Sequence, residues 1–380
     1  MDIPFNKPFT TGGEIRYLSQ AISSKQLSGN NHFTKQCQLF LENRFHCPKV
    51  LLTHSCTAAL EMSAILLNIG PGDEVIVPDF TFVSTANAFA LHGASLVFAD
   101  ISRDTLNIDP CCIEKSITER TKAIVLVHYA GVACDMDRIV LIAEKYNIPI
   151  VEDNAHGLFG KYKGRSLGTF GVLATLSFHE TKNFTCGEGG ALLINDPALK
   201  ERAEIIWEKG TDRSKFFRGE VAKYSWVDVG SSYLPSELQA AFLYAQLESH
   251  QRIQDKRQSI WRLYREHLAL WAEDMGVGLP MVPEDCEQAY HMFYLLMPSL
   301  SVRQELINYL KEKSILSVFH YLPLHLSPMG QRLSVTSGKC PVSEEISDKI
   351  LRLPFYGDLT EEDQLRVISA IKQFSFPSSI

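Results

Sequence analysis

One lysine of this chain, Lys182, lies on a turn between two apolar segments. The segment LATLSF (173–178) precedes it and GGALLIN (189–195) follows it; short apolar runs bounded by turn residues are typical of buried strands. A neutral lysine amine is both a nucleophile and a base. A solvated surface lysine is the alternative interpretation, and the partners that Lys182 could meet decide between the two.

A possible anion site follows the first predicted strand. Ser55, Thr57 and the backbone N–H groups around Ala58 open a helix, and the free N–H groups and dipole of a helix N-terminus attract negative charge. Ser177, at the end of the strand before Lys182, offers another hydroxyl. The alternative is a simple helix cap. Neither a G-x-G-x-x-G nor a Walker-type loop occurs, so a dinucleotide or P-loop fold is poorly supported.

Two further strand ends carry an aromatic ring and an acid. Phe82 follows the strand at 73–80 and could cover a flat ligand, although core packing is equally compatible with its position. Asp153 ends the strand at 148–154, with His156 three residues later. A buried acid is costly without a cationic partner, but an N-capping aspartate is the alternative. Glu152 should point to the opposite side of that strand.

These groups together describe one ligand, a phosphorylated, planar and cationic ring that carries an aldehyde. Thr57 and Ser177 would hold the phosphate, Phe82 would stack on the ring, Asp153 would pair with a protonated ring nitrogen, and Lys182 would form the covalent Schiff base. Pyridoxal 5′-phosphate has these properties. Because ligands of open α/β sheets bind outside the carboxyl ends of the strands, the order of these residues along the chain favours one shared site.

The elements that would position this site alternate between strand and helix. Val/Ile/Leu-rich runs predict strands covered on both faces, and they alternate with helices at 57–69, 83–93 and 136–147. We therefore expect an α/β domain with a mostly parallel sheet over residues 1–248. A long amphipathic helix at 249–271 would lead into a smaller α+β domain over residues 249–380. Its predicted elements are strands at 289–298 and 315–325 and a helix at 302–313.

Composition excludes several other classes of function. A net charge of −7 over 380 residues argues against a nucleic-acid binder. The N-terminus does not read as a signal peptide, and no apolar stretch is long enough to span a membrane. The nine cysteines form no C-x-x-C pair, so no metal site is expected, and their scattered positions suggest reduced thiols in a cytoplasmic protein.

Several segments resemble the DegT family of nucleotide-sugar aminotransferases, which have the fold type I of pyridoxal phosphate enzymes, similar to aspartate aminotransferase. The similarity covers essentially the whole chain. The segments that carry it are IPFNKP (3–8), SCTAALEM (55–62), PGDEVIVPDFTFVSTANA (71–88), VHYAG (127–131), VEDNAHG (151–157), SFHETKN (177–183), GEGGALLIN (187–195) and LQAAFLYAQL (238–247).

The resemblance implies a role for each candidate residue. Lys182 would carry the cofactor as an aldimine, Asp153 would pair with the ring nitrogen, and His156 would lie near the phenolic oxygen. The phosphate would be bound by Thr57, Ala58 and Ser177. Relatives are homodimers with shared active sites, and the segment matching GSSYLPSELQAA, which contains Ser232, reaches the neighbour's phosphate. Here Ser232 and Leu234 replace the Asn and Arg of many relatives, and Asn154 replaces an Ala.

The substrate implied by the nearest subgroup is a dTDP-4-oxo-6-deoxy-hexose, with L-glutamate as the amino donor. Segments 128–137, 177–185, 203–221 and 228–241 carry this finer similarity. Amination at C3, formation of the glucose epimer and a non-enzymatic regulator of the same fold remain alternatives. Gly29, His320 and His325 are candidates for sugar-nucleotide binding, against ordinary polar surface, and Lys25, Lys209, Arg213 and Arg218 are candidates for the diphosphate.

Overall fold

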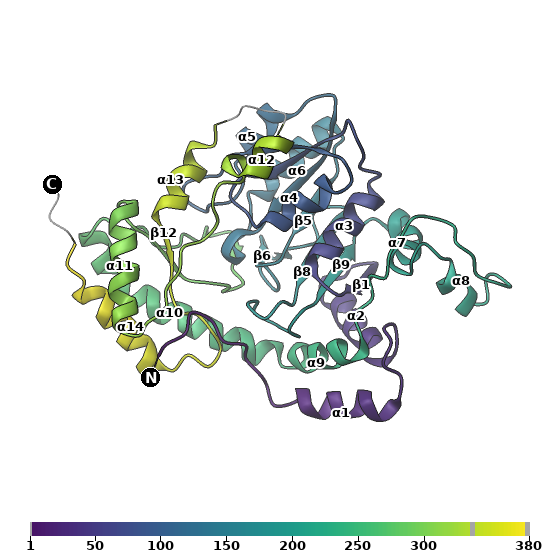
Figure 1. Ribbon diagram of the computed structural model, residues 1–380, viewed down its shortest axis with the longest axis horizontal. Helices are drawn as coiled ribbons and strands as arrows, with labels where there is room; N and C mark the ends of the chain where they lie inside the picture. Colours follow the sequence, from purple (N-terminus) through teal and green to yellow (C-terminus); the bar gives the residue numbers. More distant parts are fainter. Residues whose placement is uncertain (1, 335–338, 377–380) are drawn as a thin grey trace.

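A seven-stranded mixed sheet forms the centre of the larger part of the molecule (Figure 1). The structure is a computed structural model that describes residues 2–334 and 339–376. The strand order is β1-β9-β8-β5-β4-β2-β3. The strands are β1 (Lys49–Thr53), β2 (Glu74–Pro78), β3 (Ser95–Ala99), β4 (Thr121–Val127), β5 (Ile150–Asp153), β8 (Leu173–Ser177) and β9 (Gly190–Ile194).

Most of the sheet is parallel, as the sequence predicted. The ladders β2–β3, β2–β4, β4–β5 and β5–β8 are parallel, whereas β9 runs antiparallel to both β8 and β1. The registers pair Val127 with Asp153 and Asp153 with Thr175. Because the carboxyl ends of these strands meet at one edge, the residues that follow them converge there.

Helices cover both faces of this sheet, and its strands are almost wholly buried. The helices of this part are α1 (Glu14–Ser24), α2 (His32–Phe45), α3 (Cys56–Leu66), α4 (Val83–Ala90), α5 (Pro110–Ser116), α6 (Met136–Tyr146), α7 (Lys200–Trp207), α8 (Arg213–Phe217) and α9 (Glu237–Glu248). Two short strands, β6 (Lys161–Tyr162) and β7 (Arg165–Ser166), pair with each other, and β6 also pairs with β10 (Cys286–Glu287). No helix among the described residues is both long and apolar enough to cross a membrane.

The C-terminal part has its own core, around a two-stranded sheet. Tyr264, Phe293, Leu306, Leu351 and Val367 are buried in it. Its elements are α10 (His250–Asp274), β11 (Tyr294–Leu296), α11 (Leu300–Glu312), α12 (Pro328–Leu333), α13 (Pro341–Lys349), β12 (Ile350–Arg352) and α14 (Glu361–Gln373). The domain boundary that we propose between residues 248 and 249 falls between α9 and α10.

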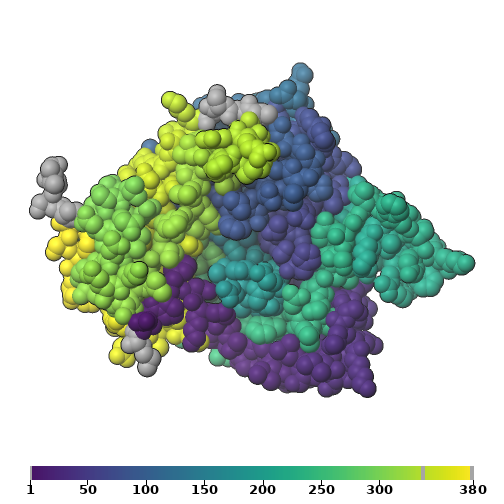
Figure 2. Space-filling model, in the orientation of Figure 1, coloured from purple at the N-terminus to yellow at the C-terminus, as the bar shows by residue number. Residues whose placement is uncertain are grey.

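The extreme N-terminal residues lie with the C-terminal part. Ile3 is buried in its core and forms a bridge with Ile315, and Phe355 donates its backbone N–H to the carbonyl of Phe5. Figure 2 shows this N-terminal segment in purple against the green and yellow C-terminal elements. Residues 209–229, which contain α8, form a segment that projects from the end of the molecule opposite to the C-terminal part (Figures 1 and 2).

Two predicted strands of the C-terminal part differ in the structure. Residues 315–325 do not form a continuous strand; Val318 makes a single bridge to Arg352, and a short 3-10 helix, Leu324–Leu326, follows. Pro323 cannot donate to a ladder, so pairing does not resume before this helix. Of residues 289–298, only Tyr294–Leu296 pair, because β12 offers only three partners.

Candidate active site

The residues predicted to act together surround one cavity of about 750 Å³, which we name the Lys182 cavity. It opens at the carboxyl ends of β4, β5 and β8 and at the N-termini of α3 and α4. Residues 318–321, Arg352 and the N-terminal residues Phe5 and Asn6 close it from the C-terminal part. The lining includes Thr57, Phe82, Asp153, His156, Ser177 and Lys182.

Lys182 is held in the turn that follows β8. Its backbone N–H donates to the carbonyl of His179 at 2.9 Å, so the side chain is presented from a fixed backbone. Burial lowers the pKa of the amine, the charge of Asp153 opposes that effect, and the charge of Arg352 adds to it. A lowered pKa increases the neutral fraction at a given pH, which is the reactive form of an amine.

Asp153 ends β5 and is buried. Oδ2 accepts a 2.8 Å hydrogen bond from the hydroxyl of Thr85, and Oδ1 accepts one of 3.2 Å from the backbone N–H of Ala155. Burial raises the pKa of Asp153, whereas the Thr85 hydrogen bond and the charge of Lys182 lower it. The thiol of Cys56 lies 3.9 Å from Oδ1. A buried carboxylate with no cationic hydrogen-bond partner is well suited to a cationic ring nitrogen.

Glu152, the next residue on the strand, points to the opposite face, as predicted. Its carboxylate accepts backbone hydrogen bonds from Gly168, Phe170 and Gly171 at 2.6–2.7 Å and lies 2.9 Å from Nε2 of His128. It therefore fixes the segment that leads into β8. Of these two adjacent acids, Glu152 thus has a structural role, whereas Asp153 faces the cavity.

The N-terminus of α3 and nearby hydroxyls form a cradle for an anion. Ser55 is the N-cap, and its hydroxyl accepts the N–H of Ala58 at 3.1 Å. Thr57 donates its hydroxyl hydrogen to Ser84 at 2.9 Å, and both side chains line the Lys182 cavity with Ser177. The Ala58 N–H predicted for the phosphate is occupied by Ser55, and Ala58 itself does not line the cavity.

Two glycines that follow Lys182, Gly187 and Gly190, allow the chain to turn and to pass close to this cradle. A Cβ on Gly190 would lie 2.4 Å from the backbone N of Cys56, so β9 can pass the start of α3 only because residue 190 is glycine. Gly187 has a φ of +84°, which the tight turn requires. The close approach at Gly190 is therefore to the helix N-terminus.

Phe82 and His156 present rings to the cavity. Phe82 is 56 % exposed at the N-cap of α4, 6.2 Å from the ring of Tyr321, so it is free to cover a flat ligand. His156 stacks on His291 with centroids 4.2 Å apart. Nε2 of His156 lies 3.4 Å from the hydroxyl of Tyr321, whereas its buried Nδ1 has no partner. Buried polar atoms normally have a hydrogen-bond partner, and a bound ligand could supply one to Nδ1 of His156.

The two proposed sugar-binding histidines are placed differently. His320 lines the Lys182 cavity and bonds through Nδ1 to the hydroxyl of Tyr129 at 2.6 Å. His325 does not line this cavity. Its ring lies between Asp79 (2.8 Å) and Glu344 (3.3 Å), because the short 3-10 helix turns it toward the larger sheet. Its position thus does not favour contact with a sugar in this cavity.

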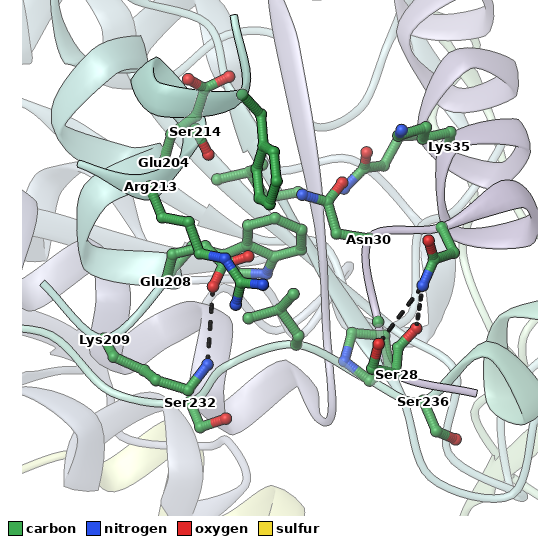
Figure 3. A pocket seen from close by; sticks show the side chains of 18 of the residues that line it. Ser28, Asn30, Lys35, Glu204, Glu208, Lys209, Arg213, Ser214, Ser232 and Ser236 are labelled. Carbon is green, nitrogen blue, oxygen red and sulfur yellow. Dashed lines mark hydrogen bonds and ion pairs between the residues drawn. The ribbon is translucent and has the colours of Figure 1, made fainter. Parts of the chain in front are cut away.

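Gly29 and Ser232 line a different cavity of about 730 Å³, which we name the Ser232 cavity (Figure 3). It shares no lining residue with the Lys182 cavity. Lys209, Arg213 and Arg218 also line it, and Figure 3 shows Arg213 reaching toward its middle. Within one chain, Ser232 is thus separate from the predicted phosphate site.

One group of potential metal ligands occurs among residues 2–334 and 339–376, namely Asp79, His325 and Cys340. Asp79 already accepts two hydrogen bonds of 2.8 Å, from the backbone N–H and from Nδ1 of His325. These contacts use the atoms that a metal would need. The three residues therefore hold the end of β2 against residues 324–326.

Sequence reasoning missed Ser84, Thr85, His291 and Arg352. Thr85 follows Phe82 by three residues, so one helical turn brings both to the same side of α4, and this spacing could have revealed it. His291 and Arg352 come from the C-terminal part, and no local pattern assigns them to this site.

The arrangement fits pyridoxal 5′-phosphate. The cavity has a hydroxyl cradle at a helix N-terminus, an exposed aromatic ring, a buried acid, an unpaired histidine nitrogen and a lysine whose pKa is lowered. Lys182 would hold the aldehyde carbon, Asp153 the ring nitrogen, and Thr57, Ser84 and Ser177 the phosphate. Each group of the cofactor thus has a chemically matched side chain.

Comparisons with known proteins lead to the same chemistry. Residues 11–372 match the DegT/DnrJ/EryC1/StrS aminotransferase family. The chain is 35% identical to an uncharacterized protein of Methanocaldococcus jannaschii (98% of this chain, 97% of that protein) and 32% identical to the spore coat polysaccharide biosynthesis protein SpsC of Bacillus subtilis (97% and 96%). The PLP form of a putative sugar aminotransferase from Streptococcus pneumoniae superposes with a TM-score of 0.90 at 28% identity, covering 98% of each chain. The chain therefore belongs to the DegT/DnrJ/EryC1/StrS family of pyridoxal phosphate-dependent aminotransferases.

Proposed function

We propose that this aminotransferase moves the amino group of L-glutamate to C4 of a dTDP-4-oxo-6-deoxy-hexose. The product would be a dTDP-4-amino-4,6-dideoxy-hexose, with galactose as the favoured configuration, for surface polysaccharide synthesis. The observation that carries the proposal is the convergence of Lys182, Asp153 and the hydroxyl cradle on one cavity. The names of SpsC and of the pneumococcal protein support a sugar substrate and a role in polysaccharide synthesis.

The residues of the cavity divide the work of amino transfer. When bound, pyridoxal phosphate supplies an aldehyde that takes up the amine and a ring that accepts electrons from the donor's α-carbon. Asp153 holds the proton on the ring nitrogen, which keeps the ring electron-poor. Lys182 Nζ, neutral once released, removes the proton from the donor's α-carbon. In the second half of the cycle the same amine returns a proton to C4 of the sugar.

The cavity also orients the reactants and limits access of water. Phe82 would cover one face of the flat ring, and the unpaired Nδ1 of His156 would hydrogen-bond to it. Phe5 and residues 318–321 cover the opening from the C-terminal part. Burial lowers the pKa of His156 and His291 well below the usual range, so both rings are neutral hydrogen-bonding groups.

A homodimer that shares its active sites is part of this proposal. The projecting segment around α8 exposes Phe217, Trp226 and Val229, and Trp226 is 79 % exposed. Exposed apolar residues on a projecting segment are typical of a protein interface. The separation of Ser232 from the Lys182 cavity in one chain is compatible with Ser232 serving a neighbour's site.

The test is incubation of the purified protein with L-glutamate and dTDP-4-oxo-6-deoxyglucose, followed by NMR of the product. We expect a new amine at C4 with the axial configuration of galactose. An equatorial amine would identify the glucose epimer. Turnover only with a 3-oxo sugar nucleotide would contradict the C4 assignment, and no amine on either substrate would overturn the proposed class of substrate.

A further inference from the structure

A buried segment of the C-terminal part, residues 289–291, contacts the turn that carries Lys182 through the side chain of Asn183. Nδ2 of Asn183 donates to the carbonyl of Ala289 at 2.7 Å, and Oδ1 lies 2.9 Å from Nδ1 of His291. Because the amide nitrogen donates to Ala289, Oδ1 is the acceptor, and Nδ1 of His291 carries the hydrogen. Asn183 directly follows Lys182, so the lysine turn itself fixes the tautomer of His291.

The backbone of this segment is held in an unusual conformation. Tyr290 has a φ of +52°, which bulky side chains rarely adopt. Arg257 donates to the carbonyls of Tyr290 and His291 at 2.9 and 2.6 Å, and a Cβ on Gly131 would lie 2.9 Å from the Cβ of Ala289. Strained backbone persists only where its surroundings over-determine it, and it gathers at functional sites. The position of His291 is therefore specified from several sides.

The ring of His291 stacks on the ring of His156. The two centroids are 4.2 Å apart, the planes differ by 17°, and both residues are buried and line the Lys182 cavity. Burial lowers both pKa values well below the usual range, so the two rings are neutral and stack without charge repulsion. The contact holds the plane of His156, whose buried Nδ1 has no hydrogen-bond partner among the described residues.

The other ring nitrogen of His156 determines what Nδ1 can offer to a ligand. Nε2 lies 3.4 Å from the hydroxyl of Tyr321. Burial raises the pKa of this hydroxyl, so it keeps its hydrogen and can donate it to Nε2. A neutral imidazole that accepts at Nε2 carries its hydrogen on Nδ1. His156 would then present an N–H to the cavity, and the phenolic oxygen of pyridoxal phosphate is a matching acceptor.

We infer that His291 is a positioning residue which, held by Asn183, sets the plane of His156 so that Nδ1 of His156 donates to the cofactor's phenolic oxygen. This inference rests on the proposed contact between His156 and the cofactor. It gives the C-terminal part a role in the cofactor site, because residues 289–291 join the turn of Lys182 to the ring of His156.

The test uses the full chain loaded with pyridoxal phosphate and the variants His291→Ala and His291→Phe. An N–H that donates to the phenolic oxygen stabilises its negative charge, so the imine nitrogen formed with Lys182 loses its proton at a lower pH. The absorbance of the bound cofactor reports the midpoint of this proton loss. We expect the midpoint to rise by about one pH unit in His291→Ala. The rise should be smaller in His291→Phe, which keeps a flat ring against His156.

A double-variant cycle shows whether His291 acts through His156. His156→Ala should also raise the midpoint, and His291→Ala should add no further rise once residue 156 is alanine. Cofactor affinity, measured by fluorescence titration of the cofactor-free protein, should fall by about 10-fold in His156→Ala and in His291→Ala. Two full and additive rises in the double variant would overturn the inference.

Nitrogen NMR of the cofactor-free protein with labelled histidine reads the tautomer directly. His291 should carry its hydrogen on Nδ1 in the unaltered protein, and Asn183→Ala should remove this preference. A hydrogen on Nε2 of His291 in the unaltered protein would contradict the inference, because Asn183 would then not hold the ring.

His250→Ala is the matched control. His250 also packs on an aromatic ring, 5.3 Å from the centroid of Phe159, and its Nδ1 lies 3.0 Å from the carbonyl of Leu247, but it does not line the Lys182 cavity. Its loss should leave the midpoint and the cofactor affinity unchanged.

The remaining outcomes separate this inference from the proposed site. An equal shift of the midpoint in His250→Ala and His291→Ala would assign His291 a merely structural role. A shift in His156→Ala that is absent from His291→Ala would overturn the inference alone. An unchanged midpoint in His156→Ala would instead contradict the proposed contact between His156 and the cofactor, and the inference with it.

Discussion

The hydroxyl of Thr85 donates a 2.8 Å hydrogen bond to Oδ2 of Asp153, which ties the first turn of α4 to the end of β5. This contact links the helix that presents Phe82 to the acid that would pair with the protonated nitrogen of the cofactor ring. It also opposes the effect of burial on the Asp153 pKa, because a hydrogen bond to a carboxylate stabilises its charged form.

Replacement of Thr85 by valine should shift the pH dependence of amino transfer. Asp153 must be charged to hold the proton on the ring nitrogen, so activity falls as pH falls through its pKa. Burial already raises this pKa, and loss of the Thr85 hydrogen bond raises it further. The acid limb of kcat/KM against pH should therefore move to higher pH. An unchanged acid limb would show that the limb does not report Asp153.

Asp153→Asn and Glu152→Gln form a matched pair on adjacent positions of β5. Asp153→Asn should lower amino transfer by about 10²-fold or more with little change in melting temperature, because burial disfavours its charge in the free protein. Glu152→Gln should instead reduce the free energy of unfolding by about 2 kcal/mol, because its buried carboxylate accepts three backbone N–H groups. Thermal melts and turnover of both variants distinguish the two roles. A reversal of these effects would contradict the assignment.

Gly190→Ala should weaken cofactor binding. The new Cβ would lie 2.4 Å from the backbone N of Cys56, so α3 or β9 must shift, at a cost of about 1–3 kcal/mol, and the cradle would widen. Gly70→Ala is the control, because a Cβ at that position would meet no heavy atom within 4 Å and the φ of Gly70 is not positive. Cofactor affinity can be measured by fluorescence titration. Equal affinity in both variants would show that the approach of β9 to α3 does not shape the phosphate site.

Trp226→Glu should weaken the proposed homodimer. Loss of a central tryptophan from an interface typically costs at least ~2 kcal/mol, or about 30-fold in the dimer Kd. Leu270→Glu is the control, since Leu270 is 77 % exposed and belongs to α10 of the C-terminal part, outside the projecting segment. Light scattering at several concentrations measures the dimer. A dimer unaffected by Trp226→Glu would place the interface elsewhere.

The larger sheet and its edge could be predicted because their signals are local. Short Val/Ile/Leu runs identify buried strands, and the residues directly after them lie at the carboxyl edge. Lys182, Asp153 and Phe82 were found in this way, and all three line one cavity. Thr85 has the same kind of signal, through its spacing from Phe82.

The contribution of the C-terminal part depends on tertiary contacts that leave no local pattern. Arg352 reaches the Lys182 cavity because β12 pairs with β11 and because Val318 bridges to Arg352, and neither pairing can be read from short strands. The apolar run at 315–325 resembles a strand, yet Pro323 and the following 3-10 helix turn His325 toward Asp79. Ala58 was assigned correctly to the helix N-terminus, but the cap formed by Ser55 uses its N–H.

The central claim is that Lys182 holds the cofactor, and borohydride reduction followed by peptide mass spectrometry tests it most directly. Reduction of the loaded protein should fix a pyridoxyl phosphate group irreversibly on the peptide that contains Lys182, and on no other lysine peptide. Lys182→Ala should carry no label, lose the visible absorbance of the bound cofactor and transfer amino groups at least about 10³-fold more slowly. Label on another lysine, or full turnover of Lys182→Ala, would contradict the account.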